Sequence, residues 1–111
     1  MFIKTKNYIR LLIWKCKLVK IQLQKKYKHA SDFGIIGNYD TINAKAFEKA
    51  IIKHFLDKDT QLIQGAYRED PVNHYFNKVT KVNVICKDKR FLSGWKLSRM
   101  QQSYILTSGS L

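Results

Sequence analysis

The spacing of hydrophobic residues predicts helices in the first half of the chain. Between residues 8 and 23 the apolar positions recur with helical spacing, which predicts an amphipathic helix. Apolar residues also lie on the opposite side of this helical wheel, and residues 20–24 alternate as a strand would. A second helix is predicted from residue 43 to about residue 57, with Asn43 as its N-cap. The buried positions of this second helix are expected to be Phe47, Ala50, Ile51 and Phe55.

The second half of the chain has the pattern of short strands separated by turns. Strands are predicted at about residues 62–69, 72–77, 82–87 and 91–97. The connections at Asp70-Pro71, at 77–81 and at 88–90 are short enough to be hairpin turns, so the sheet is expected to be antiparallel. Residues 31–40 predict a loop, and Ser98 is expected to cap a last helix over residues 100–106, with Gly109 beyond its end. Together these elements predict a single α+β domain whose N-terminal helices pack on a four-stranded antiparallel meander.

The charge of the chain indicates a polyanionic partner. Its 111 residues include 21 Lys and Arg but only 8 Asp and Glu, which gives a net charge of +13. Such an excess favours binding to nucleic acid, to an acidic membrane surface or to an acidic protein. Residues 1–31 carry nine basic side chains and no acidic one, so the charge is concentrated at the N-terminal end.

The cysteines and the N-terminal segment exclude several classes of protein. Cys16 and Cys86 are far apart and form no CxxC pair, so we expect reduced thiols, and neither a disulfide scaffold nor a zinc site. Arg10, Lys15 and Lys17 interrupt the apolar N-terminal stretch, so neither a signal peptide nor a transmembrane anchor is expected.

One candidate for chemistry is the sequence KYKH at residues 26–29. His29 directly follows a run of lysines, and nearby positive charge disfavours its protonated form. Cleavage of RNA by its own 2′-OH needs such a proton-transfer group, and Lys26 and Lys28 could stabilise the charge that develops at phosphorus. The alternative is a solvated basic run without a catalytic role.

A second candidate is the sequence FLSGWKL at residues 91–97. On a strand Ser93 and Trp95 share one face, with Phe91 and Leu97 on either side, and Gly94 leaves room for close approach on the other face. A hydroxyl for phosphate beside an indole for base stacking suits a nucleic-acid surface, whereas the alternative places Trp95 in the core.

The other histidines and the acidic residues are weaker candidates. His54 lies in the apolar stripe of the second predicted helix and is expected to be a core histidine. His74 could face either the core or the site, and it is a secondary catalytic candidate. Asp57 and Asp59 are expected to be a solvated helix end, so no metal site and no cofactor are predicted.

Five segments together resemble the colicin D nuclease family, which includes toxins of contact-dependent inhibition and other polymorphic bacterial toxins. They are KYKHASDFGI at 26–35, FEKAIIKHFLDKDT at 47–60, GAYR at 65–68, VNHYFN at 72–77 and FLSGWKLS at 91–98. The resemblance covers about residues 25–111, which we expect to form the nuclease domain. Residues 1–24 match nothing in that family and are expected to be a separate basic amphipathic segment.

The resemblance implies a metal-independent ribonuclease that cleaves tRNA in the anticodon loop, and an acidic cognate immunity protein that neutralises it. It also implies a toxin delivered into the cytoplasm of a target bacterium. The catalytic residues that it implies are His29, Lys26, Lys28, Ser93 and Trp95. We further expect Lys25, Arg68 and Lys96 to bind the substrate.

Two functions of other classes remain open on the sequence. The chain could be a noncatalytic basic RNA-binding module whose lysines only contact phosphates. Residues 8–23 could also form a helix that lies on a membrane surface.

Overall fold

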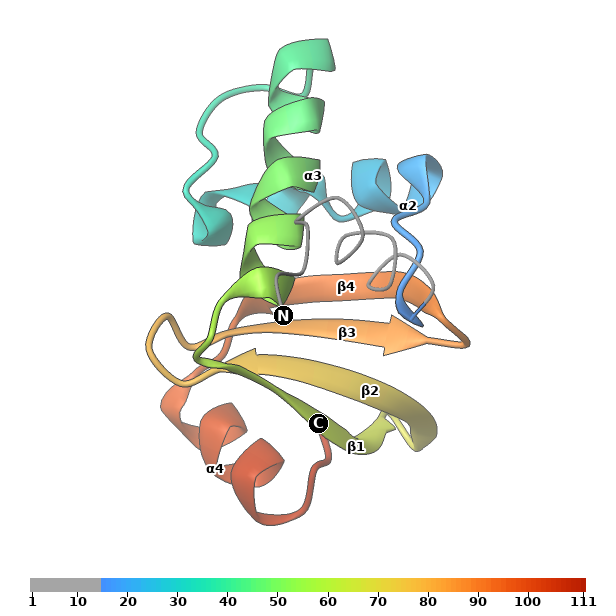
Figure 1. The fold of residues 1–111 in the computed structure, drawn as a ribbon, viewed down its shortest axis with the longest axis vertical. Helices are drawn as coiled ribbons and strands as arrows, with labels where there is room; N and C mark the ends of the chain where they lie inside the picture. The colour runs from blue at the N-terminus through green and yellow to red at the C-terminus, as the bar shows by residue number, and fades with distance from the viewer. Residues whose placement is uncertain (1–14) are drawn as a thin grey trace, which may run out of the picture.

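The computed structural model describes residues 15–111, in which two α-helices and a 3₁₀ helix precede a four-stranded sheet and one helix follows it (Figure 1). The elements in chain order are α2 (Lys20–Lys25), the 3₁₀ helix η1 (Tyr27–Phe33), α3 (Thr41–Leu56), β1 (Thr60–Tyr67), β2 (Asp70–Asn77), β3 (Val82–Lys87), β4 (Arg90–Lys96) and α4 (Arg99–Thr107). No helix within residues 15–111 is long and apolar enough to cross a membrane.

The sheet is a simple antiparallel meander with the strand order β1-β2-β3-β4. This confirms the predicted α+β class and all four strands. The first turn, however, consists of Arg68 and Glu69 at φ 49° and 72°, so the expected turn at Asp70-Pro71 is wrong. Pro71 is tolerated in β2 because pairing with β3 begins only at Asn73.

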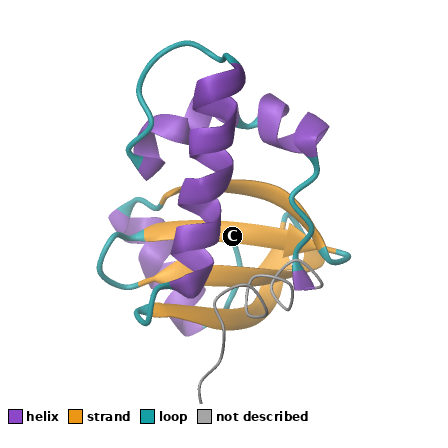
Figure 2. Cartoon of the chain, turned by 45° about the horizontal axis from the view of Figure 1, so that its top comes forward, coloured by secondary structure: helices purple, strands orange, loops and turns teal. Residues whose placement is uncertain are grey.

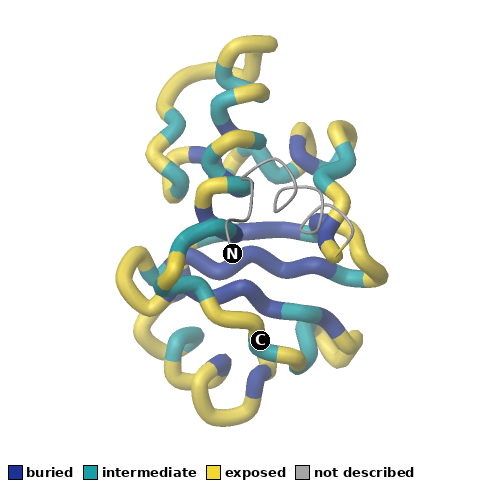
Figure 3. The backbone as a smooth tube through the Cα atoms, in the orientation of Figure 1, coloured by how far each residue is buried: buried dark blue, intermediate teal, exposed yellow. Residues whose placement is uncertain are grey.

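Helices cover both faces of the sheet (Figure 2). The α3 residues Phe47, Ile51 and Phe55 pack with Tyr75 and Val84 on one face. On the other face Ile105 of α4 packs with Phe76 and Leu97. The strands β2 and β3 between these layers are largely buried, as Figure 3 shows. Of the four positions predicted to be buried on the second helix, only Ala50 is partly exposed.

The capping residues of the helices agree with the prediction at α4 but not at α3. Asp40, not Asn43, is the N-cap of α3, and its carboxylate accepts the backbone N–H of Asn43 at 2.7 Å. Ser98 caps α4 as predicted, and Gly109 follows that helix with a φ of 71°. Part of the predicted loop at 31–40 belongs to η1, which ends at Gly34 in the left-handed conformation.

The predicted helix over residues 8–23 is interrupted at residues 16–19, whereas residue 15 and residues 20–23 are helical as predicted. Lys17 is paired with the start of β4: its N–H donates to Lys89 at 2.7 Å, and its carbonyl accepts from Phe91 at 2.9 Å. The helix α2 begins at Lys20 and includes the residues 20–24 whose alternation resembled a strand. Residues 8–14 of the prediction lie outside the described part of the chain.

The expectation of two reduced thiols is also wrong. Cys16 and Cys86 form a disulfide whose Cα atoms are 5.7 Å apart, and both residues are buried in the core. The bridge joins the segment before α2 to the centre of the sheet across 70 residues of sequence. Sequence spacing could not reveal it, because the fold brings the two cysteines together.

We predict that replacing both cysteines by serine lowers the free energy of unfolding by about 2–4 kcal/mol, since a cross-link closing a long loop restricts the unfolded chain. Urea unfolding of the oxidised protein and of the Cys16→Ser/Cys86→Ser variant measures the difference. A reducing agent should lower the Tm of the parent protein and leave that of the double variant unchanged. Equal stability of the two proteins would contradict the prediction.

Candidate active site

The candidate site lies where η1 meets β4. The rings of His29 on η1 and Trp95 on β4 have their centroids 5.9 Å apart, with 36° between their planes. The two sequence motifs, more than sixty residues apart in the chain, are therefore neighbours in space.

Two contacts hold η1 against β4. A Cβ atom at Gly94 would lie 3.0 Å from Cζ of Phe33, so the glycine permits the close approach that the sequence predicted. The carboxylate of Asp32 accepts the backbone N–H of Lys96 at 2.9 Å. Because Phe33 and Asp32 follow His29 by only a few residues, these contacts also fix the position of the histidine.

The basic residues converge at the junction of α2 and η1. Positions three apart lie on the same side of a 3₁₀ helix, which brings Lys26 and His29 together, and the His29 N–H donates to the Lys26 carbonyl at 3.0 Å. Partial burial lowers the pKa of Lys26, and the charges of Lys28, Arg68 and Lys25 lower it further. The structure thus places three of the other predicted cations close enough for their charges to act on Lys26.

The environment of His29 favours the neutral form of its imidazole. Partial burial is the largest cause that lowers the pKa of His29, followed by the charges of Lys28 and Lys26. Asp32 acts in the opposite direction, but its effect is the smallest of the four. A neutral imidazole can accept a proton, as a general base requires.

The turn between β1 and β2 forms another side of the site. The guanidinium of Arg68 lies 5.0 Å from the ring centroid of Tyr67, and the Tyr67 ring lies 5.9 Å from that of Trp95. The C-terminal residues hold this turn in place, because the Arg68 N–H donates to the Leu111 carbonyl at 2.9 Å. Sequence reasoning selected Arg68 but missed Tyr67, although GAYR was among the segments that carried the resemblance.

Ser93 and Trp95 share a face of β4, but Phe91 does not. A register shift between β3 and β4 places a bulge at Leu92, so Phe91 enters the core beneath α3. Ser93 is only 2% exposed, whereas Trp95 is partly exposed and packs against the core beneath α4. The indole therefore belongs both to the candidate site and to the edge of that core. Lys96, the remaining predicted substrate contact, is exposed.

The other two histidines support the fold. His54 is buried, as predicted, and its Nε2–H donates to the Tyr75 carbonyl at 2.7 Å. His74 is completely buried; its Nε2–H donates to the Ala66 carbonyl and its Nδ1 accepts from Asn83, both at 3.0 Å. Burial lowers the pKa of both imidazoles. The structure does not bring His74 to the surface that His29 and Trp95 share.

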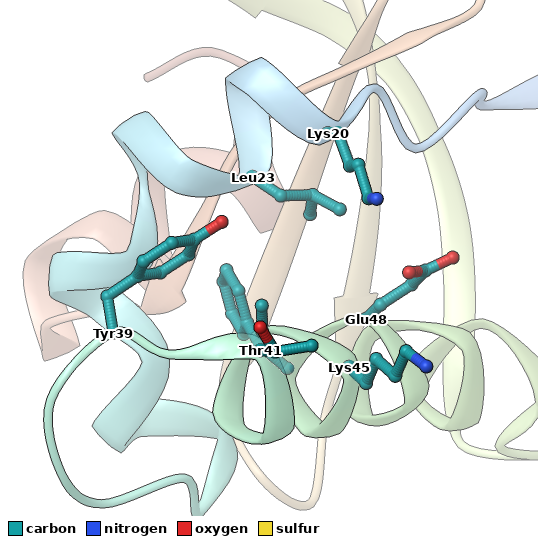
Figure 4. Close-up of a pocket in the computed structure, with 8 residues that line it drawn as sticks. Lys20, Leu23, Tyr39, Thr41, Lys45 and Glu48 are labelled. Carbon is teal, nitrogen blue, oxygen red and sulfur yellow. The ribbon is translucent and has the colours of Figure 1, made fainter.

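None of the candidate residues lines the pocket in Figure 4. This cavity of about 130 Å³ lies between α2, the loop that follows η1, and α3, and Leu23 and Tyr39 contribute to its wall. Lys20, Lys45 and Glu48 also line it. Within residues 15–111, no cluster of three or more His, Cys, Asp or Glu side chains could hold a metal ion.

Comparison with known proteins identifies the family. A family model for colicin D matches residues 22–105. The chain belongs to the colicin D family. It is 46% identical to colicin-D from Escherichia coli over 82 residues, which are 69% of this chain but only 11% of colicin-D. The chain therefore spans about a tenth of the length of this relative.

A solved structure agrees in fold and in extent. A ribonuclease from Escherichia coli, solved in complex with its inhibitor protein, superposes with a TM-score of 0.73 at 42% identity. The match covers 81% of this chain and 100% of that one. The division of this chain into a segment 1–24 and a domain 25–111 stays a prediction, as do the roles of its site residues.

We predict that His29 titrates below pH 6.5 and that Lys28→Ala raises its pKa, because removal of a neighbouring positive charge makes the imidazolium less unfavourable. NMR titration of the His29 ring protons measures both effects. The matched control is Lys58→Ala, which removes an equal charge just beyond α3 and should leave the titration of His29 unchanged. Equal shifts in the two variants would contradict a local effect of Lys28.

Proposed function

We propose that this chain is a toxin ribonuclease that cleaves tRNA in the anticodon loop. The observation that carries the proposal is the contact between His29, whose pKa is lowered, and Trp95, with Lys26 and Lys28 beside the imidazole. The match to a solved ribonuclease of the same fold supports the reaction class. The choice of tRNA and of its anticodon loop comes from the resemblance to the family.

The proposed reaction is an attack of the substrate's 2′-OH on the adjacent phosphorus. His29 accepts the 2′ proton as the new P–O2′ bond forms, and the imidazolium returns a proton to the 5′ oxygen as the P–O5′ bond breaks. The products are a 2′,3′-cyclic phosphate and a free 5′-OH. Lys26 and Lys28 stabilise the negative charge that builds up on the phosphate oxygens.

The remaining residues bind the substrate in this proposal. The partly exposed indole of Trp95 stacks on a base, while Lys25, Arg68 and Lys96 contact neighbouring phosphates. Ser93 is assigned to a phosphate oxygen, which must approach the strand closely because the residue is 2% exposed. No cofactor takes part, and lysine rather than a metal ion supplies the positive charge.

An acidic immunity protein is the proposed partner, and the cytoplasm of a target bacterium is the proposed place of action. The related ribonuclease was solved with its inhibitor protein. A net charge of +13 would attract an acidic surface at long range, and such a surface could cover the lysines of the site. The producing cell needs this neutralisation if the chain is a toxin.

We predict that His29→Ala loses cleavage of total tRNA by at least about 10²-fold and keeps tRNA binding, because proton transfer is removed while the phosphate contacts remain. Lys26→Ala and Lys28→Ala should each lose about 10²-fold in kcat. Gel analysis of the fragments and a filter-binding assay measure the two properties, and a thermal melt verifies the fold.

The control for the lysine variants is Lys58→Ala, which should cleave normally. A His29→Ala protein that retains more than about a tenth of the parent rate would contradict its catalytic role. A parent protein that binds tRNA without cutting it would instead favour the noncatalytic RNA-binding module.

We also predict that cleavage survives excess EDTA and leaves a 2′,3′-cyclic phosphate on the upstream fragment. RNA with a 2′-deoxy nucleotide at the cut site should bind but stay intact, because it lacks the nucleophile. Mass spectrometry of the fragments identifies the termini. Activity that EDTA abolishes and Mg²⁺ restores, or cleavage of the 2′-deoxy substrate, would overturn this mechanism.

A further inference from the structure

One side chain of α4 reaches the candidate site. The side-chain oxygen Oε1 of Gln101 accepts two hydrogen bonds, from the backbone N–H of Ser98 at 3.0 Å and from the indole Nε1–H of Trp95 at 3.3 Å. The first bond is half of the capping box of α4, whose other half runs from the Gln101 N–H to the Ser98 hydroxyl at 3.2 Å. The start of α4 and the orientation of Trp95 therefore depend on the same oxygen atom.

The bond to Gln101 uses the only polar atom of the indole. Tryptophan has one donor and no acceptor, and Trp95 also packs against the rings of His29 and Tyr67 and against the apolar cluster beneath α4. Packing contacts of this kind are not directional. The hydrogen bond to Gln101 is directional and thus sets the orientation of the indole ring relative to the imidazole of His29.

The orientation of the indole also affects how far the His29 imidazole is buried, and thereby its pKa. Partial burial of the imidazole is the largest cause of its lowered pKa, and Trp95 is the aromatic residue in contact with it. The charged groups that act on His29 are Lys28 and Lys26, which lower its pKa, and Asp32, which raises it. An indole released from Gln101 would leave these charges in place and expose the imidazole to water.

On the basis of the proposed ribonuclease function, we infer that Gln101 is a positioning residue that holds the Trp95 indole against His29 through its side-chain oxygen. It couples the first turn of α4 to the proton-transfer group without contacting the substrate. Misplacement of a catalytic or substrate-binding group by about 1 Å can cost 10²-fold in rate, so the loss of this contact should appear in kcat.

The test compares Gln101→Met, which has similar length but lacks the acceptor, with three other variants. Gln101→Glu keeps an oxygen for both N–H groups. Ser98→Ala breaks the other half of the capping box and leaves the bond to the indole. Gln102→Met is the matched control, because it makes the same substitution one residue further on and removes only a hydrogen bond to the Leu97 carbonyl at 3.1 Å.

Three measurements are made on each variant: kcat for tRNA cleavage, the NMR titration of His29, and the signal of the Trp95 indole N–H, assigned with a Trp14→Phe variant. Gln101→Met should lower kcat about tenfold or more, move the His29 pKa toward its ordinary value and speed exchange of the indole proton. Gln101→Glu should restore kcat to within about threefold of the parent. Ser98→Ala and Gln102→Met should stay within about twofold, although the former lowers the Tm.

The inference is overturned if Gln101→Met changes kcat and the His29 titration no more than Ser98→Ala and Gln102→Met do. It is equally overturned if Gln101→Glu fails to restore kcat while the indole N–H stays protected from exchange. If the parent protein does not cleave tRNA, the proposed function fails, and the two NMR signals alone decide whether Gln101 positions the indole against His29.

Discussion

The outer edge of β4 is the constraint on which the rest of the structure depends. An edge strand leaves backbone groups without strand partners, and the segment before α3 supplies them. Lys17 pairs with the start of β4, the Gln22 side chain donates to the Leu92 carbonyl at 2.7 Å, and Asp32 accepts from the Lys96 N–H. These contacts attach residues 17–32 to β4 at three points, and His29 lies between the second and the third.

The edge position of β4 also explains how His29, from the layer of α3 and η1, contacts Trp95, which packs on the side covered by α4. Gly94 faces the layer of α3 and η1, whereas Trp95 points to the side covered by α4. In the middle of the sheet these two layers would be separated by the neighbouring strands. At the edge, η1 can extend past the strand, so His29 meets Trp95 from the opposite side.

The fold was largely predictable because its local signals agree with the tertiary structure. Alternation defined the strands, and Ser98 could be predicted as the cap of α4 because capping is local and needs no long-range partner. The interruption of the N-terminal helix at residues 16–19 was not predictable, because the pairing of Lys17 with β4 overrides the helical spacing there. The bulge at Leu92 and the disulfide depend on register and on three-dimensional proximity, which periodicity does not report.

Some residues of the candidate site could be selected from the sequence, whereas others were found only in the structure. The resemblance paired KYKH with SGWK, and the contact between His29 and Trp95 agrees with that pairing. Tyr67 and Gln101 were missed, since neither is unusual in its local sequence. Gln101 has an evident task as a helix cap, and only the structure reveals that the same oxygen accepts the indole N–H.

The fold holds Lys26 close to other positively charged side chains. Lys26 lies between a helix anchored by the disulfide-linked segment and a 3₁₀ helix fixed by Asp32 and Phe33. Partial burial lowers the pKa of Lys26, and the nearby charges of Lys28, Arg68 and Lys25 lower it further, so the site opposes the charged form of Lys26. A polyanion relieves this repulsion when it binds, because each phosphate that approaches the cluster stabilises the charged lysines. In the proposed function, the positive charge around Lys26 therefore favours the polyanionic partner that the composition indicates, on the side of the molecule that carries His29.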